Sequence, residues 1–127
     1  MEIKTGLTGS ASKYVTDPDT AVNVKSGTLK VLATPVLAAL MEEAAVNALA
    51  EYLPKEQTTV GGYIAVRHNA ATLPGHRIEA EAKITHVENK KISFHITASD
   101  DKGPVGEAEH TRFIVDTESF MDRVKNK

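Results

Sequence analysis

One long apolar segment, residues 35–53, precedes a run of alternating segments, and this order most constrains the fold. The segment is rich in Ala and Leu, which are strong helix formers. Thr34 followed by Pro35 is typical of a helix start, with Thr34 as the N-cap and Pro35 as the first helical residue. Pro54 predicts where the helix ends. We therefore predict a single long, largely apolar helix in the first half of the chain.

Beyond this helix, apolar and polar residues alternate with a period of two, as in half-buried strands. Short turns make neighbouring strands antiparallel, so we predict a four-stranded meander with the helix across its apolar face. The fold class is therefore α+β, an antiparallel sheet wrapped around one central helix. The four predicted strands cover residues 61–70, 77–87, 91–100 and 105–116.

The remaining segments are short. Residues 117–127 predict a closing helix, and residues 9–15 and 20–24 could form two more strands around the turn at 17–19. A length of 127 residues argues for one domain, residues 1–127. An exposed sheet edge favours pairing with a second copy, so we expect a homodimer.

The composition excludes several kinds of function. Lys plus Arg is 15 and Asp plus Glu is 17, so bulk charge gives no support to nucleic-acid binding. The chain has no cysteine, which rules out disulfides, thiolate catalysis and Cys-ligated metals. It has no HExxH-like spacing, no signal peptide and no apolar run of membrane-spanning length. We expect a cytoplasmic, soluble protein with no metal and no cofactor.

Two adjacent glutamates on the predicted helix differ in their surroundings. Glu43 lies on a polar stripe with Asn47 and Glu51. Glu42 lies about 100° away, and a buried unpaired carboxylate is costly. It could tie down a loop amide or an Arg, serve a site, or lie in a subunit interface. All its helical neighbours are apolar: Ala38, Ala39, Ala45, Val46 and Leu49.

His68 and Thr34 are two further candidates. His68 continues the inner face of Ile64 and Val66, so it points toward the helix. Such a histidine is either a structural core residue or a base that a carboxylate orients. The Thr34 hydroxyl can cap the helix or react, and the two roles compete.

Two adjacent glycines and a His-x-Arg pair are the remaining unusual features of the sequence. Gly61 and Gly62 open the strand that carries His68, and they form either a plain turn or a backbone that a ligand can approach. His110 and Arg112 share an inner face, which indicates a cross-strand pair or an interface contact.

The segments VLATPVLAALMEEAA, TTVGGYIAVRHNAATLPG and GEAEHTRFIVD resemble, in this order, the hotdog-fold acyl-CoA thioesterases that act on fluoroacetyl-CoA. The resemblance covers about residues 31–116. It implies a hotdog fold, usually dimeric, with the site near the subunit interface and acyl-CoA as the substrate. Phenylalanines precede the catalytic Thr in that family, but residues 24–33, VKSGTLKVLA, contain no aromatic residue. This departure leaves fluoroacetyl selectivity open and thioester hydrolysis as the expected activity.

The resemblance also implies roles for five residues. Thr34, Glu42 and His68 match the catalytic set of the family. Gly61 matches a glycine whose backbone N–H faces the thioester carbonyl, and Arg112 matches an arginine near the acyl site.

The leading hypothesis is hydrolysis of a small acyl-CoA thioester. His68, oriented by Glu42, would be the general base, and it would activate either Thr34 or water. A second hypothesis is a hotdog domain that binds acyl-CoA or a small ligand without turnover, because Thr34 has a structural explanation and pocket aromatics are missing. A hydratase or dehydratase is a third, but HNAATLPG does not resemble the H-x-x-x-G-x-P segment of dehydratases.

Overall fold

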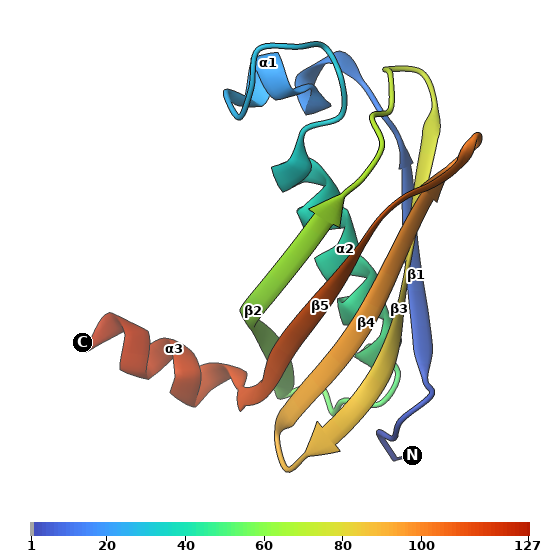
Figure 1. Cartoon of the computed structure of the whole chain (residues 1–127). Helices are drawn as coiled ribbons and strands as arrows, with labels where there is room; N and C mark the ends of the chain where they lie inside the picture. Colours follow the sequence, from blue (N-terminus) through green and yellow to red (C-terminus); the bar gives the residue numbers. More distant parts are fainter. Residues whose placement is uncertain (1) are drawn as a thin grey trace.

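The computed structural model describes residues 2–127, and within them the strands form one five-stranded antiparallel sheet (Figure 1). The spatial order is β1-β3-β4-β5-β2, so β1 and β2 are the two edges. The strands are β1 (Thr8–Tyr14), β2 (Gln57–His68), β3 (Arg77–Glu88), β4 (Lys91–Asp100) and β5 (Gly103–Asp116).

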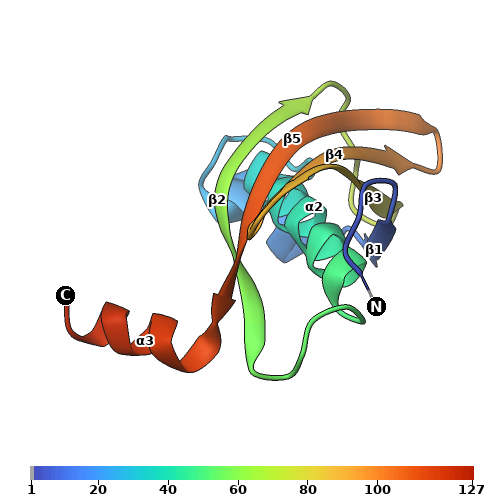
Figure 2. The same cartoon turned by 90° about the horizontal axis from the view of Figure 1, so that it is seen from below.

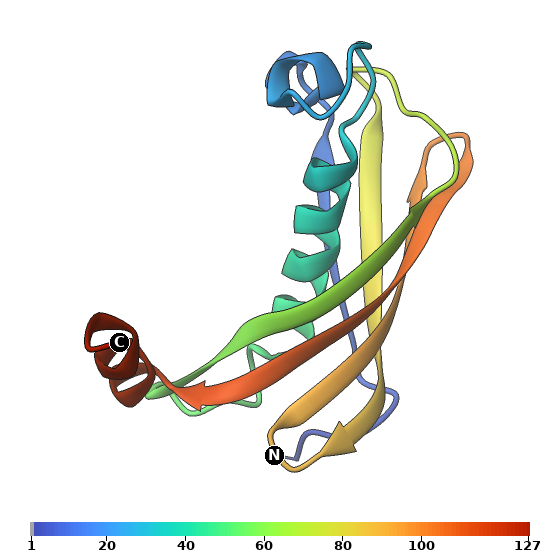
Figure 3. The same ribbon diagram turned by 60° about the vertical axis from the view of Figure 1, so that its left-hand side comes forward.

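The sheet curls around α2 (Thr34–Leu49), which lies in its concave face (Figure 2). A 3₁₀ turn, η1 (Asp17–Asp19), and a short helix, α1 (Ala21–Val24), lie beside the N-terminal end of α2. The closing helix, α3 (Thr117–Lys125), projects away from the sheet and has no buried residue (Figure 3). The predicted architecture, one long helix wrapped by an antiparallel sheet, is confirmed.

The core forms where α2 meets the inner face of the sheet. The buried face of α2 carries Leu37, Leu40, Met41, Ala44, Ala45, Ala48 and Leu49. The predicted alternation in β3 and β4 is confirmed, because their inward residues are buried: Ile78, Ala80, Ala82, Ile84, Ile92, Phe94, Ile96 and Ala98. Burial of this apolar surface is the main favourable term in the folding free energy.

Gly9 allows β1 to lie directly against the backbone of α2. A Cβ at Gly9 would lie 2.2 Å from the backbone nitrogen of Ala48 and 2.6 Å from the carbonyl oxygen of Ala44. The side-chain amide of Asn47 also donates to the carbonyl of Ser10 at 2.8 Å. Small residues on both elements therefore set how closely the helix approaches this edge of the sheet.

The predicted four-stranded meander was wrong in the position of β2. Only β3, β4 and β5 form a meander, while β2 pairs with β5 at the far edge. Residues 69–76 make this possible, because they carry the chain from β2 across to β3 instead of forming a tight turn. The strand proposed at 9–15 exists as β1, and it occupies the edge beside β3. The strand proposed at 20–24 was wrong, because α1 forms there.

The predicted helix limits also need correction. The N-cap is Ala33, and Thr34 is already helical with no capping hydrogen bond from its side chain. Since Pro35 lacks an N–H in any case, the first turn loses little without a hydroxyl cap. The helix ends at Leu49 rather than at residue 53. The Thr34 hydroxyl is therefore free to make another contact.

No helix within residues 2–127 combines the length and the apolar character needed to cross a membrane.

We predict that Gly9→Ala destabilises the fold by about 2 kcal/mol or more, because the added methyl meets helix backbone that cannot move aside. Urea unfolding of the variant and the parent would measure the difference in the free energy of unfolding. Ser10→Ala, at the neighbouring exposed position, is the matched control and should change little. Equal stability of Gly9→Ala and the parent would contradict the close approach of β1 and α2.

Candidate active site

Thr34 and His68 meet where α2 begins and β2 ends. The Thr34 Oγ1 lies 2.7 Å from Nδ1 of His68. Thr34 is exposed and His68 is half-buried. In the tautomer that carries its proton on Nε2, Nδ1 accepts the hydrogen bond from the hydroxyl. A hydroxyl nucleophile and its general base require a hydrogen bond of this length.

Burial keeps the His68 ring neutral. Desolvation lowers the pKa of His68 below its ordinary value of 6.5, and the backbone of Ala70 offsets this only in part. The Nε2 atom is buried and makes no hydrogen bond within residues 2–127. A neutral imidazole beside a hydroxyl is able to accept a proton near neutral pH.

A cavity of about 240 Å³ opens beside this pair. Its walls come from the segment before α2 and from the residues that follow β2. The lining residues are Ala21, Ser26, Val31, Leu32, Thr34, His68, Asn69, Ala70 and Ala71. Most of these side chains are small, so they leave open space beside the Thr34 hydroxyl.

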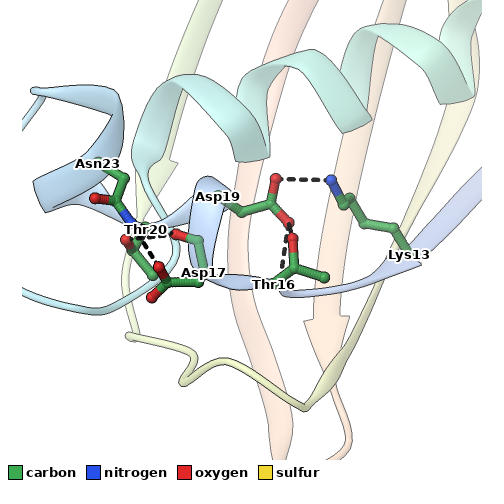
Figure 4. Close-up of polar contacts among 6 residues, drawn as sticks. All are labelled: Lys13, Thr16, Asp17, Asp19, Thr20 and Asn23. Carbon is green, nitrogen blue, oxygen red and sulfur yellow. Dashed lines mark hydrogen bonds and ion pairs between the residues drawn. The ribbon is translucent and has the colours of Figure 1, made fainter.

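Hydrogen bonds of Asp19 connect the segment on the outer side of this cavity with the start of α2. Its carboxylate accepts hydrogen bonds from Lys13 Nζ at 2.8 Å and from the Thr16 N–H and hydroxyl at 2.9 and 3.0 Å (Figure 4). Burial raises the pKa of Asp19, but these hydrogen bonds outweigh burial and hold it below its ordinary value. The Asp19 carbonyl accepts from the N–H of Ala33, the residue before Thr34.

A second polar cluster surrounds Gly61, further along β2. A Cβ at Gly61 would lie 2.9 Å from Glu42 Oε2, 3.3 Å from Arg112 Nη1 and 3.5 Å from His110 Cε1. Arg112 Nη1 lies 3.7 Å from Glu42 Oε2, and the Arg112 side chain is only 9% exposed, compared with 40% for Glu42. The absence of a side chain at Gly61 leaves the surface above this ion pair open.

Arg112 is held in place by its other contacts. Its Nε donates to the Thr59 hydroxyl at 2.9 Å, and its Nη2 donates to the Thr59 carbonyl at 3.1 Å. Burial lowers the pKa of Arg112, and the Glu42 carboxylate counteracts this. A guanidinium group remains charged under these conditions. The cluster therefore carries a fixed positive charge beside a carboxylate.

The two clusters do not meet within one chain. Gly61 and His68 are seven residues apart on β2, which corresponds to roughly 20 Å of strand. No hydrogen bond or ion pair joins Glu42 and His68 within residues 2–127. The structure thus brings together Thr34 with His68, and Glu42 with Gly61 and Arg112.

Sequence reasoning gave His110 only a cross-strand or interface role, and it did not single out Thr59 or Asp19. The period-two pattern of β5 placed His110 on the inner face beside Arg112, which was the available signal. Thr59 and Asp19 carry no such signal, because their contacts depend on residues distant in the sequence.

A family model described as fluoroacetyl-CoA-specific thioesterase matches residues 15–118. The chain belongs to the fluoroacetyl-CoA-specific thioesterase family. The fluoroacetyl-CoA thioesterase of Streptantibioticus cattleyicolor is 35% identical to this member over 98 residues, which cover 77% of this chain and 70% of that protein.

Solved structures agree with this membership. One structure of the fluoroacetyl-CoA thioesterase superposes on this family member with a TM-score of 0.93 and 28% identity, covering 100% of this chain and 98% of that one. A hot-dog-like protein from Thermanaerovibrio acidaminovorans, at 24% identity, shares the fold with a TM-score of 0.88 over 98% of this chain and 92% of its own. The predicted family and the hotdog fold are confirmed. The roles of Thr34, Glu42, His68, Gly61 and Arg112 stay predictions.

We predict that the fold loses stability as the pH falls below 6.5. The pKa values of His68 and His110 are lower in the folded chain than their ordinary value of 6.5. Below pH 6.5 the unfolded chain therefore binds protons that the folded chain excludes, whereas above 6.5 both states are neutral.

Chemical unfolding between pH 7.5 and 5.5 would measure this effect, since most carboxylates remain ionised there. His68→Gln should give a shallower loss of stability than the parent. His86→Gln, at an exposed position, should follow the parent curve. A parent whose stability is constant across this range would contradict the neutral, buried state of both rings.

Proposed function

We propose that this protein hydrolyses small acyl-CoA thioesters to the free acid and CoA. The observation that carries the proposal is the contact of 2.7 Å between Thr34 Oγ1 and His68 Nδ1 at the edge of a cavity. A thioester carbonyl needs a nucleophile, a base and a donor for the developing oxyanion. This pair would supply the first two.

The relatives support acyl-CoA as the substrate class. The similar protein from Streptantibioticus cattleyicolor is a fluoroacetyl-CoA thioesterase. A variant of the fluoroacetyl-CoA-specific thioesterase, 28% identical to this chain, was solved with fluoroacetate and CoA. Another variant, 27% identical, was solved with acetyl-CoA. A cavity of about 240 Å³ is in keeping with a small acyl group.

The proposal includes a homodimer formed through the open edge of β2. Edge strands present unpaired backbone groups that favour pairing with another strand. If β2 pairs antiparallel with its own copy about a two-fold axis through Ala65, with Gly62 as the extra residue in this ladder as well, Gly61 of one copy lies opposite His68 of the other. Thr34 and His68 of one subunit would then share a site with Glu42 and Arg112 of the second copy.

A bulge in β2 makes this pairing consistent with the direction of the side chains. The register between β2 and β5 shifts between Gly61 and Tyr63, so Gly62 is the extra residue. In a regular strand, positions 61 and 68 would face opposite sides, because seven is an odd number. With the bulge, both face the helix. Residues directly opposite each other in an antiparallel pair face the same side, so the two can line one site.

The proposed reaction begins with His68 as the base. It removes a proton from Thr34 or from water, and the oxygen forms a bond to the thioester carbonyl carbon. The N–H near Gly61 and the charge of Arg112 would stabilise the oxyanion. The C–S bond then breaks, and CoA leaves as the thiol with the proton from His68. Glu42 would stabilise the protonated imidazole.

The two routes differ in one intermediate. Attack by Thr34 produces an acyl ester that water must cleave, whereas attack by water yields the acid in one addition. A burst of free CoA in the first turnover, absent in Thr34→Ala, would indicate the ester.

A domain that binds acyl-CoA without turnover is the alternative. It depended on a structural explanation for Thr34, namely a capping role, and on the missing pocket aromatics. The Thr34 hydroxyl makes no cap, and it contacts His68 instead. This contact favours turnover over simple binding.

We predict release of free thiol from a panel of acetyl-, fluoroacetyl-, propionyl- and butyryl-CoA. His68→Ala should lower kcat/KM by about 10²–10⁴, the usual contribution of a general base. His95→Ala, which removes a ring on β4 that pairs with Glu109, is the control and should not change the rate. If no acyl-CoA is turned over, or if His68→Ala keeps the parent rate, the proposal fails.

A further inference from the structure

His110 is a buried histidine that the proposed reaction does not use. It is 2% exposed and lies on β5, directly opposite Ile64 of β2. Its ring stacks on Phe94 with the ring centroids 5.9 Å apart. A polar ring in the core needs hydrogen-bond partners, and both of its nitrogens have one.

The two contacts define the tautomer of the ring. Nδ1 lies 2.7 Å from the backbone carbonyl of Tyr63. A carbonyl only accepts, so Nδ1 carries the proton and donates it. In the neutral ring, Nε2 then has a free lone pair, and Arg112 Nη1 donates to it at 3.3 Å. Burial lowers the pKa of His110, which keeps the ring neutral.

These contacts complete the hold on Arg112. Thr59 fixes the Nε and Nη2 edges of the guanidinium, and His110 fixes one N–H of Nη1. Nη1 has a second N–H, and Nη1 lies 3.7 Å from Glu42 Oε2. That distance is an ion pair but is too long for a hydrogen bond. The Nη1 end of Arg112 therefore lies beneath the open surface above Gly61, in an ion pair with Glu42 but without a direct hydrogen bond to it.

We propose that His110 is a positioning residue, which holds Nη1 of Arg112 between Glu42 and the open surface above Gly61 so that its charge faces the thioester carbonyl. The proposal rests on the thioesterase function above. His110 itself lies beneath this surface and acts through Arg112. Without the Nε2 acceptor, only the two Thr59 contacts would hold the guanidinium, and its Nη1 end could tilt about them toward Glu42 and close the ion pair.

Three variants at position 110 separate this role from simple packing. His110→Phe keeps the stacking on Phe94 and removes both nitrogens. Gln places a polar atom near the position of Nε2 and can accept from Arg112. His110→Asn places a polar atom near the position of Nδ1, and this atom can reach only the Tyr63 carbonyl. A packing role predicts that Phe is the best replacement, whereas the positioning role predicts Gln.

The expected result is a loss of kcat/KM by about 10-fold or more in the Phe and Asn variants, since a hydrogen bond to a charged group is removed. His110→Gln should stay within about threefold of the parent. Melting temperatures measured in parallel show whether each variant folds. If Gln is as impaired as Phe at equal stability, or if Phe retains the parent rate, the proposal is overturned.

A measurement that needs no activity separates this proposal from the proposed function. In ¹⁵N NMR, the guanidinium of Arg112 should rotate more slowly in the parent and in His110→Gln than in His110→Asn, which keeps only the two Thr59 contacts. The exposed Arg77 and Arg123 provide internal references in the same spectra. Fast rotation of Arg112 in the parent would overturn the positioning role. If the parent is inactive but its Arg112 guanidinium rotates slowly, only the thioesterase function is refuted.

Discussion

The bulge at Gly62 is the constraint on which the rest of the site depends. It is one extra residue in a 12-residue strand, and it reverses the alternation of the side chains beyond it. Gly61 consequently shares the inner face of Ile64, Val66 and His68. Phe113 of β5 packs over Gly62 of β2, and a Cβ added at Gly62 would lie 2.5 Å from the Phe113 ring. A larger residue would disturb this packing, so the choice of glycine and the position of the bulge are coupled.

The second constraint is the distribution of charge in a largely apolar interior. Arg112 is buried with its hydrogen bonds provided by Thr59 and His110, while Glu42, its opposite charge, remains 40% exposed. The two groups form an ion pair at 3.7 Å, which is too long for a direct hydrogen bond, so the second N–H of Nη1 can donate to a group at the surface above Gly61. Within one chain, the neutral His68 and the Thr34 hydroxyl lie away from this charge.

The sequence predicted the inner faces of β3 and β4, the long helix, and the unusual position of Glu42, because each depends on local periodicity. It did not predict that β2 pairs with β5, since that pairing depends on where residues 69–76 lead the chain. It assigned Thr34 to the N-cap because Thr-Pro is typical of that position, whereas the structure places Ala33 there. The contacts of Arg112 with Thr59, 53 residues away, have no local signature.

The central claim is that one site is built from two copies of the chain, and mixing two variants tests it most directly. His68→Ala and Glu42→Gln remove groups from the two separate clusters, and each variant alone should be inactive as a dimer. After unfolding and refolding together, half of the dimers are mixed, and each mixed dimer has one intact site if the site is shared. A shared site predicts recovery of about a quarter of the parent activity, with sedimentation confirming dimers throughout. A mixture as inactive as the separate variants would contradict the shared site.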